Sequence, residues 1–102
     1  MDAPSSTAMI GRIEATPDNR DALARALVDE VGEMPGCLSY LVSIDPGDAN
    51  GVWIAECWAD RDAHRHWLDS AETRDLIARL VPLMKGYSER HEVTPVGLKV
   101  KE

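Results

Sequence analysis

Two runs of β-forming residues flank a dense turn signal near the middle of this chain. The first run is Cys37–Ile44 (CLSYLVSI) and the second is Val52–Trp58 (VWIAECW), both rich in the β-branched, aromatic and aliphatic residues that suit strands. Between them, Asp45–Gly51 (DPGDANG) consists mainly of residue types that favour turns. Because a short connection of this kind joins antiparallel strands, we predict a β-hairpin.

The alternation of side chains along the two strands predicts which residues face each other. On one face the expected partners are Ile44 with Val52, Tyr40 with Glu56, and Leu38 with Trp58. Glu56 matters most here, because a carboxylate on an apolar face needs a partner. We expect a hydrogen bond to Tyr40 or a salt bridge across a dimer; the alternative is a catalytic base with a raised pKa.

The residues before the hairpin predict a strand and then a helix. The strand is expected over Met9–Ala15 (MIGRIEA), with Met9, Gly11 and Ile13 on one side. Thr16 and Pro17 then suggest an N-cap followed by proline at the first helical position. Over residues 17–32 the apolar residues recur at helical spacing, at Leu23, Leu27 and Val31.

Two helices and a final strand are predicted after the hairpin. Asp60 is a favourable N-cap for a short helix over Asp60–Leu68, and Ser70 is a favourable cap for a second helix. Pro82 is expected to bend or end the second helix because it has no backbone N–H. Gly86 is expected to end the helical region, and Tyr87–Thr94 is expected as the last strand.

These elements follow the order β-α-β-β-α-β, which is the ferredoxin-like arrangement of the α+β class. Helices would cover one face of an antiparallel sheet, and the strands also carry apolar residues on the other face. Burying that second face most simply requires a second copy of the chain, so we predict a homodimer. The expected domain spans residues 8–95, preceded by a loose lead-in (1–7) and followed by a tail (96–102) that could contact the partner subunit.

Composition excludes several classes of function. The formal net charge is -7, and the basic residues are scattered, whereas phosphate binding needs clustered Lys and Arg. We therefore expect no nucleic-acid partner. No run approaches the roughly 18 apolar residues of a membrane span, and the N-terminus lacks the pattern of a signal peptide. The predicted location is the cytoplasm.

The chain carries two cysteines, Cys37 and Cys57, without metal-ligand spacing. In an intracellular protein such a pair is expected to be reduced and structural. No metal-binding cluster, glycine-rich phosphate loop or nucleophile elbow is present in the sequence. We therefore predict neither a metal nor another cofactor.

In its order of short segments, the chain resembles the antibiotic biosynthesis monooxygenase (ABM) domain, a small dimeric α+β barrel. The resemblance covers roughly residues 8–95. The matching pieces are Pro35–Tyr40, Asp45–Pro46, Glu56–Trp58, Asp60–Leu68, Ser70–Glu72 and Pro82–Met84. It implies oxygenases that act without a cofactor on quinols or polyketide-like phenols, and also haem-degrading relatives.

Two positions depart from the patterns of that family. Quinol-type members often carry a histidine eleven residues after the motif glutamate, where this chain has Trp67, with His66 one residue earlier. Haem-degrading members have a histidine where this chain has Ile77, and an asparagine on the first strand, which the segment MIGRIEA lacks. Haem ligation is therefore not predicted.

Candidate site residues cluster on the short helix and on the hairpin. Trp67 and His64 lie three residues apart on the helix, so both can face one cavity, where the indole would stack on a planar substrate and the imidazole would take a phenolic proton. The alternative is that Trp67 fills the core and His64 is half exposed. The predicted substrate-binding residues are Tyr40, Glu56, Trp58, Arg74 and Met84. Trp58 could instead be packing and Arg74 could be solvated.

Three functions remain open from the residues. The first is a cofactor-independent monooxygenase that oxidises a quinol or polyketide-like phenol with O₂. The second is a non-catalytic dimer that binds a hydrophobic aromatic ligand in the same cavity. The third is an isomerase or cyclase, because moving protons needs the same pocket and base but no O₂.

Overall fold

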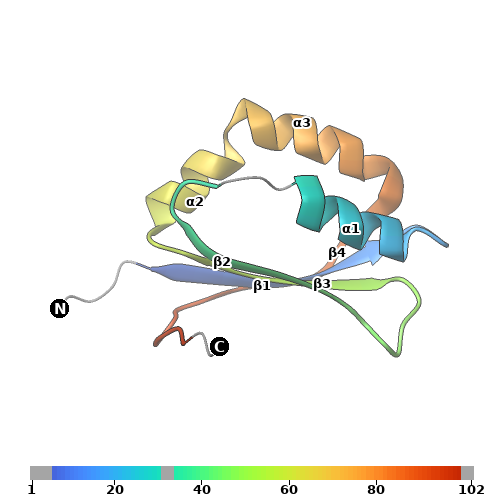
Figure 1. Ribbon diagram of the computed structural model, residues 1–102, viewed down its shortest axis with the longest axis horizontal. Helices are drawn as coiled ribbons and strands as arrows, with labels where there is room; N and C mark the ends of the chain where they lie inside the picture. The colour runs from blue at the N-terminus through green and yellow to red at the C-terminus, as the bar shows by residue number, and fades with distance from the viewer. Residues whose placement is uncertain (1–5, 31–33, 100–102) are drawn as a thin grey trace.

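The computed structural model describes residues 6–30 and 34–99 of the 102-residue chain. A four-stranded antiparallel sheet with the strand order β2-β3-β1-β4 carries its helices on one face (Figure 1). The elements in chain order are β1 (Thr7–Ala15), α1 (Arg20–Glu30), β2 (Cys37–Ile44), β3 (Gly51–Trp58), α2 (Arg61–Leu68), α3 (Ala71–Leu80), the 3₁₀ turn η1 (Val81–Leu83) and β4 (Met84–Val93). This order and topology confirm the predicted ferredoxin-like α+β fold.

The two helices after the hairpin begin where their caps predict. Oδ1 of Asp60 accepts a hydrogen bond from the backbone N–H of Ala63 at 2.7 Å, and Oγ of Ser70 accepts one from Thr73 at 3.2 Å. Each bond satisfies an amide that the first helical turn leaves without a partner. Pro82 ends α3 as expected, because the chain tightens there into η1.

The first helix begins later than predicted. Asp18 has a left-handed backbone with φ 68°, so residues 16–19 form a turn in which the amide of Asn19 donates to the carbonyl of Thr16 at 3.0 Å. Helix α1 therefore starts at Arg20, and Thr16 is not its N-cap. The end of the predicted helix at residues 31–33, including Val31, lies outside the described residues.

The hairpin forms with the predicted register over most of its length. Tyr40 pairs with Glu56, and Ile44 pairs with Val52. The predicted pairing of Leu38 with Trp58 is wrong, because the register shifts between Cys37 and Ser39 and places Cys37 opposite Trp58. The extra residue in β2 is Leu38, which is 56% exposed. A bulge of this kind turns one side chain out of the regular alternation.

Strand β4 begins three residues before its predicted start and contains two irregularities. Ile13 pairs with Tyr87 and Arg12 with Glu89, so Ser88 is an extra residue in β4. A second shift leaves Lys85 between the pairs that β4 makes with Ala15 and Glu14. Gly86 lies within this stretch at φ 131°, a conformation that favours glycine, and so it does not end a helix as predicted.

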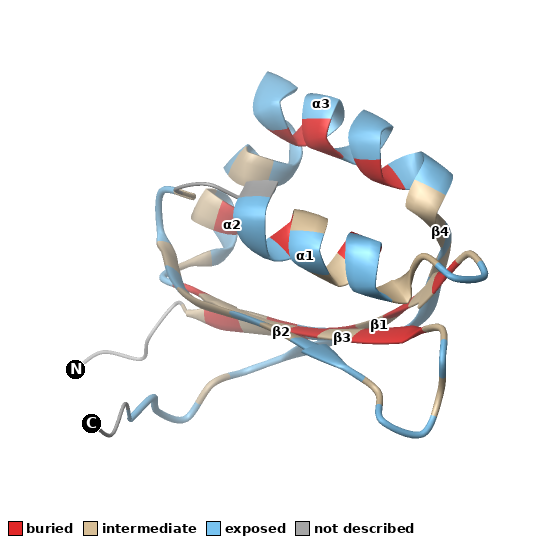
Figure 2. Ribbon diagram, turned by 45° about the vertical axis from the view of Figure 1, so that its right-hand side comes forward, coloured by how far each residue is buried: buried red, intermediate tan, exposed pale blue. Residues whose placement is uncertain are grey.

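The main core lies between the helices and the sheet (Figure 2). Its buried members are Ile13, Ala15, Leu23, Leu27, Val52, Ile54, Leu76 and Leu80. Met9 and Gly11 are buried on the same side of β1 as Ile13, which confirms the predicted face of that strand. None of the helices in the described parts of the chain is long and apolar enough to cross a membrane.

The face of the sheet away from the helices carries an apolar row that runs across the strands. Leu41 pairs with Ala55, which also pairs with Ile10 on the other side. Leu41 is 61% exposed and Ile10 is 40% exposed. The described chain therefore leaves this apolar row in contact with solvent.

Candidate functional site

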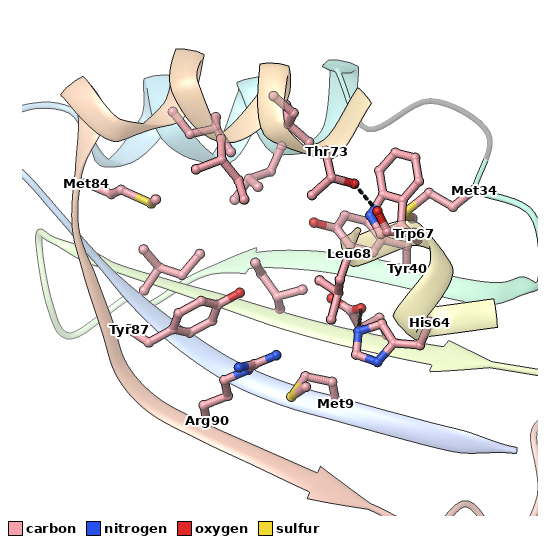
Figure 3. Close-up of a pocket in the computed structure, with 17 residues that line it drawn as sticks. Met9, Met34, Tyr40, His64, Trp67, Leu68, Thr73, Met84, Tyr87 and Arg90 are labelled. Carbon is pink, nitrogen blue, oxygen red and sulfur yellow. Dashed lines mark hydrogen bonds and ion pairs between the residues drawn. The ribbon is translucent and has the colours of Figure 1, made fainter. Parts of the chain in front are cut away.

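A cavity of about 160 Å³ lies between the sheet and the helices (Figure 3). Its wall is mainly aliphatic and sulfur-containing side chains from β1, α1, β3, α2, α3 and β4 and from Met34 before β2, together with Trp67. The polar side chains in the wall are Tyr40, Glu56, His64, Thr73, Tyr87 and Arg90. An engineered cavity of about 150 Å³ holds a benzene molecule, so this one has room for a single aromatic ring.

Glu56, Trp58 and His64 form a compact group at one end of this cavity. Oε1 of Glu56 accepts a hydrogen bond from Nε1–H of Trp58 at 2.7 Å and lies 3.5 Å from Nε2 of His64. The rings of Trp58 and His64 are in contact, with centroids 4.9 Å apart. The side chain of Glu56 is only 13% exposed and that of His64 only 11%. The structure thus brings a carboxyl group, an indole N–H and an imidazole nitrogen together in a nearly dry place.

The local sequence explains why these three residues meet. Glu56 and Trp58 are two residues apart on β3, so their side chains leave the same face of the sheet. Helix α2 begins three residues after Trp58, and its cap at Asp60 directs the first turn back over the end of the strand. The fourth helical residue, His64, is then buried against Trp58.

Two tyrosines keep their protons at neutral pH. Burial raises the pKa of Tyr40 well above its usual range, and the Glu56 carboxylate beside it raises that pKa further. The same two causes raise the pKa of Tyr87. Both phenols are therefore neutral and can donate a hydrogen bond to an oxygen atom placed in the cavity.

The irregular strand β4 contributes Tyr87 and Arg90 to the same cavity wall. Residues three apart on a regular strand point to opposite faces, but the extra residue Ser88 brings both side chains to the helix side. Gly11 gives the Tyr87 ring its place, because a Cβ there would lie 3.0 Å from Cε1 of Tyr87. The Arg90 guanidinium carbon lies 5.5 Å from the centre of the Tyr87 ring.

Trp67 forms part of the wall at the end of α2. Its side chain is half-buried and packs against the main core. Its carbonyl oxygen accepts hydrogen bonds from the hydroxyls of Ser70 and Thr73 (Figure 3 shows the latter). These bonds join the end of α2 to the start of α3, so the position of Trp67 is set by both helices.

Most of the predicted site residues meet in this cavity. Those that line it are Tyr40, Glu56, His64, Trp67 and Met84. Trp58 is completely buried behind the wall and is linked to the site by its hydrogen bond to Glu56. Arg74 is exposed on α3, outside the wall, and its guanidinium donates to the carbonyl oxygen of Asp69 at 3.5 Å.

The sequence analysis missed Thr73, Tyr87 and Arg90. Tyr87 and Arg90 were assigned to the last strand, but their common face depends on the bulge at Ser88, which no local motif marks. The other histidines lie elsewhere: His66 is exposed on α2, and His91 is exposed beside Glu89 on β4. Of the two partners predicted for Glu56, the Tyr40 hydroxyl is replaced by the indole of Trp58 in the described chain, and the salt bridge across a dimer stays a prediction.

The cysteines are free, as predicted. Burial raises the pKa of the Cys37 thiol, which lowers its share of reactive thiolate. Within residues 6–30 and 34–99, no three His, Cys, Asp or Glu side chains are grouped so that they could hold a metal ion.

Comparison with known proteins places this chain in a family. The sequence profile described as "Antibiotic biosynthesis monooxygenase" matches residues 7–79. A candidate antibiotic biosynthesis monooxygenase from Chloroflexus aurantiacus J-10-fl has 41% sequence identity and a TM-score of 0.86, with 93% of this chain and 97% of that chain covered.

More distant structures share the fold. A candidate antibiotic biosynthesis monooxygenase from Caulobacter crescentus CB15 has 17% identity and a TM-score of 0.80, with 92% of each chain covered. Rv0793 from Mycobacterium tuberculosis has 20% identity and a TM-score of 0.74, covering 93% of this chain and 99% of its own. No curated protein matches the sequence significantly. The profile match and the Chloroflexus structure together show that this chain belongs to the antibiotic biosynthesis monooxygenase family.

Proposed function

We propose that the protein is a cofactor-independent monooxygenase that oxidises a quinol or polyketide-like phenol with O₂. The observation that carries this proposal is the pairing of His64 with Glu56 in the wall of a mainly apolar cavity of one-ring size. Membership of a family described as monooxygenases supports the same reaction class. The cavity geometry then suggests a role for each polar group.

In the proposed reaction, the substrate ring lies in the cavity with Trp67 as part of its wall. His64 accepts the proton of a phenolic hydroxyl, and Glu56 orients the imidazole and stabilises the imidazolium that forms. Trp58 is a positioning residue, since it holds Oε1 of Glu56 from behind. Tyr40 and Tyr87, both protonated, donate to oxygen atoms of the substrate or of reduced O₂.

The phenolate formed in this way is electron-rich at the ring carbon beside the oxygen. That carbon gives electrons to O₂ and forms a C–O bond, and the O–O bond then breaks to release water. For a quinol, the ring C–H and the two O–H groups become a hydroxyquinone, so one quinol and one O₂ yield one hydroxyquinone and one water. The apolar wall keeps bulk water away from the reactive intermediate.

We also propose that the protein is a homodimer. The apolar row of Leu41, Ala55 and Ile10 on the outer sheet face supports this assembly, because a second sheet packed on it would remove the row from solvent. In the tail, Val96 is fully exposed and Leu98 is 56% exposed. A partner subunit would give both side chains an apolar surface to contact.

Oxygen uptake tests the proposed reaction. Protein treated with a chelator is mixed with 1,4-dihydroxynaphthalene or with anthrone, and uptake is compared with the protein-free rate. The variant His64→Gln should lose about 100-fold or more of the catalysed rate. His66→Gln, an exposed site on the same helix, is the matched control and should keep the wild-type rate.

Three results would contradict the proposal. Product formed from these substrates at the same rate without O₂ would indicate an isomerase or cyclase. Binding without turnover would indicate a ligand-binding dimer. A His64→Gln variant as active as His66→Gln would remove His64 as the base.

A further inference from the structure

An open hollow of about 450 Å³ adjoins the cavity beside α2 and β4. It is lined by Met9, Arg61, His64, Arg65, Leu68, Arg90 and Glu92. Four of these residues, Met9, His64, Leu68 and Arg90, also line the cavity, so the two spaces are adjacent. Figure 3 shows Arg90 at this end, with its guanidinium directed between Tyr87 and Met9 toward the cavity.

The charges around the hollow are predominantly positive. Arg61 lies 3.9 Å from the carboxylate of Glu92, which also accepts a hydrogen bond from Thr7. Within the described parts of the chain, Arg65 and Arg90 have no carboxylate within ion-pair distance. Arg12, Arg20, Arg25 and Arg61, by contrast, each lie within ion-pair distance of an acidic side chain.

The geometry of Arg90 suits a bound anion. Its guanidinium lies near the face of the Tyr87 ring, which restricts its motion and leaves its N–H groups free to donate. A guanidinium offers two parallel N–H donors that match the two oxygens of a carboxylate. Arg65 lies on α2 one residue after His64, and it lines the same hollow. Two cations from different elements thus face one space.

The sizes of the two spaces indicate where each part of a substrate would bind. The cavity has room for about one aromatic ring. A larger ligand would extend out of the cavity, and the adjacent hollow would then bring it to Arg90 and Arg65. We propose that the substrate carries a carboxylate, which Arg65 and Arg90 bind in the hollow while the phenolic ring occupies the cavity. This inference rests on the proposed function, because it assigns the aromatic substrate to the same cavity.

A matched pair of ligands tests the inference by isothermal titration calorimetry. The probes are 6-hydroxy-2-naphthoate and its methyl ester, which share the phenolic ring system and differ in the charge. The wild-type protein should bind the acid about tenfold more tightly than the ester. In Arg90→Gln and in Arg65→Gln this preference should fall several-fold, while the affinity for the ester stays the same.

The control variant is Arg25→Gln, which removes one positive charge from α1, a helix that contributes no residue to the lining of the hollow. It should keep the full preference for the acid, which separates a local contact from a change in overall charge. Far-UV circular dichroism checks that each variant folds. If Arg90→Gln fails to fold, the inference is tested by the wild-type preference for the acid and by the loss of that preference in Arg65→Gln.

Each outcome is decisive. Equal affinity of the wild-type protein for acid and ester overturns the carboxylate site and leaves the aromatic cavity intact. A preference that Arg25→Gln reduces as much as Arg90→Gln also overturns it. Failure of both ligands to bind overturns this inference and the proposed substrate class together.

Discussion

The indole N–H of Trp58 donates a 2.7 Å hydrogen bond to Oε1 of Glu56, two residues earlier on the same strand. One oxygen of the carboxylate is thereby held by a side chain that is itself completely buried. The same oxygen lies 3.5 Å from His64, so the bond also sets the position of the imidazole. The pair links the rigid core to the candidate site.

Trp58→Phe should therefore destabilise the protein although it keeps an aromatic ring in the core. A hydrogen bond to a charged group contributes about 1.5–3 kcal/mol, so we expect the free energy of unfolding to fall by about 2 kcal/mol. Chemical denaturation measures this. The control is Trp53→Phe. The N–H of Trp53 makes a long 3.4 Å hydrogen bond to Asp45, so its loss should lower the free energy of unfolding by clearly less. Equal losses of stability in the two variants would show that the hydrogen bond to Glu56 contributes no more than the bond to Asp45.

Trp67→Ala separates a cavity wall from a core side chain. Replacing a fully buried tryptophan with alanine typically lowers the free energy of unfolding by about 3–5 kcal/mol. Trp67 is only half-buried and borders the cavity, so the loss should be smaller than that. Binding of 1,4-dihydroxynaphthalene should weaken at least several-fold. A large loss of stability with unchanged binding would assign Trp67 to the core alone.

Alkaline pH should destabilise the fold through Tyr40. The folded state holds the Tyr40 proton more tightly than the unfolded state, because the folded pKa is raised. Above the unfolded pKa of about 10, the unfolded chain binds fewer protons, so the free energy of unfolding falls as pH rises. The limiting slope is about 1.4 kcal/mol per pH unit for one group.

Two variants test which tyrosine causes the fall in stability at alkaline pH. Tyr40→Phe should flatten the alkaline fall in stability measured by denaturation at several pH values. Tyr87→Phe should flatten it less, because Tyr87 is 52% exposed and water screens its surroundings. Tyr40 and Tyr87 are the two tyrosines of the chain, so phenolate absorbance reports their ionisation directly. An unchanged slope in Tyr40→Phe would contradict the assignment.

Leu41→Asp should break the proposed homodimer. The substitution puts a charge at the β2 end of the outer apolar row, opposite Ala55 on the neighbouring strand. Sedimentation equilibrium should show a dimer for the wild-type protein and a monomer for the variant. Val28→Asp, at a 50% exposed position on α1, is the control and should remain a dimer. A wild-type monomer at micromolar concentration would refute the assembly.

Features that depend on neighbouring residues could be predicted from the sequence. The turn at Asp45–Gly51 and the caps at Asp60 and Ser70 act within a few residues, so their local chemistry is sufficient. The cluster of Tyr40, Glu56, His64 and Trp67 followed from strand alternation and helical spacing. The cap at Thr16 failed because Thr and Pro suit a turn as well as a helix start, and Asp18 takes the left-handed turn conformation.

The sequence by itself determined the element order, the hairpin and five of the residues that line the cavity, namely Tyr40, Glu56, His64, Trp67 and Met84. Only the tertiary structure decided the partners of Glu56 and the face of Tyr87 and Arg90. The physical reason is that one extra residue, Ser88 in β4, reverses every later side chain of a strand. Whether that bulge forms depends on packing between segments far apart in the chain, such as the Tyr87 ring against Gly11, and no spacing within β4 records it.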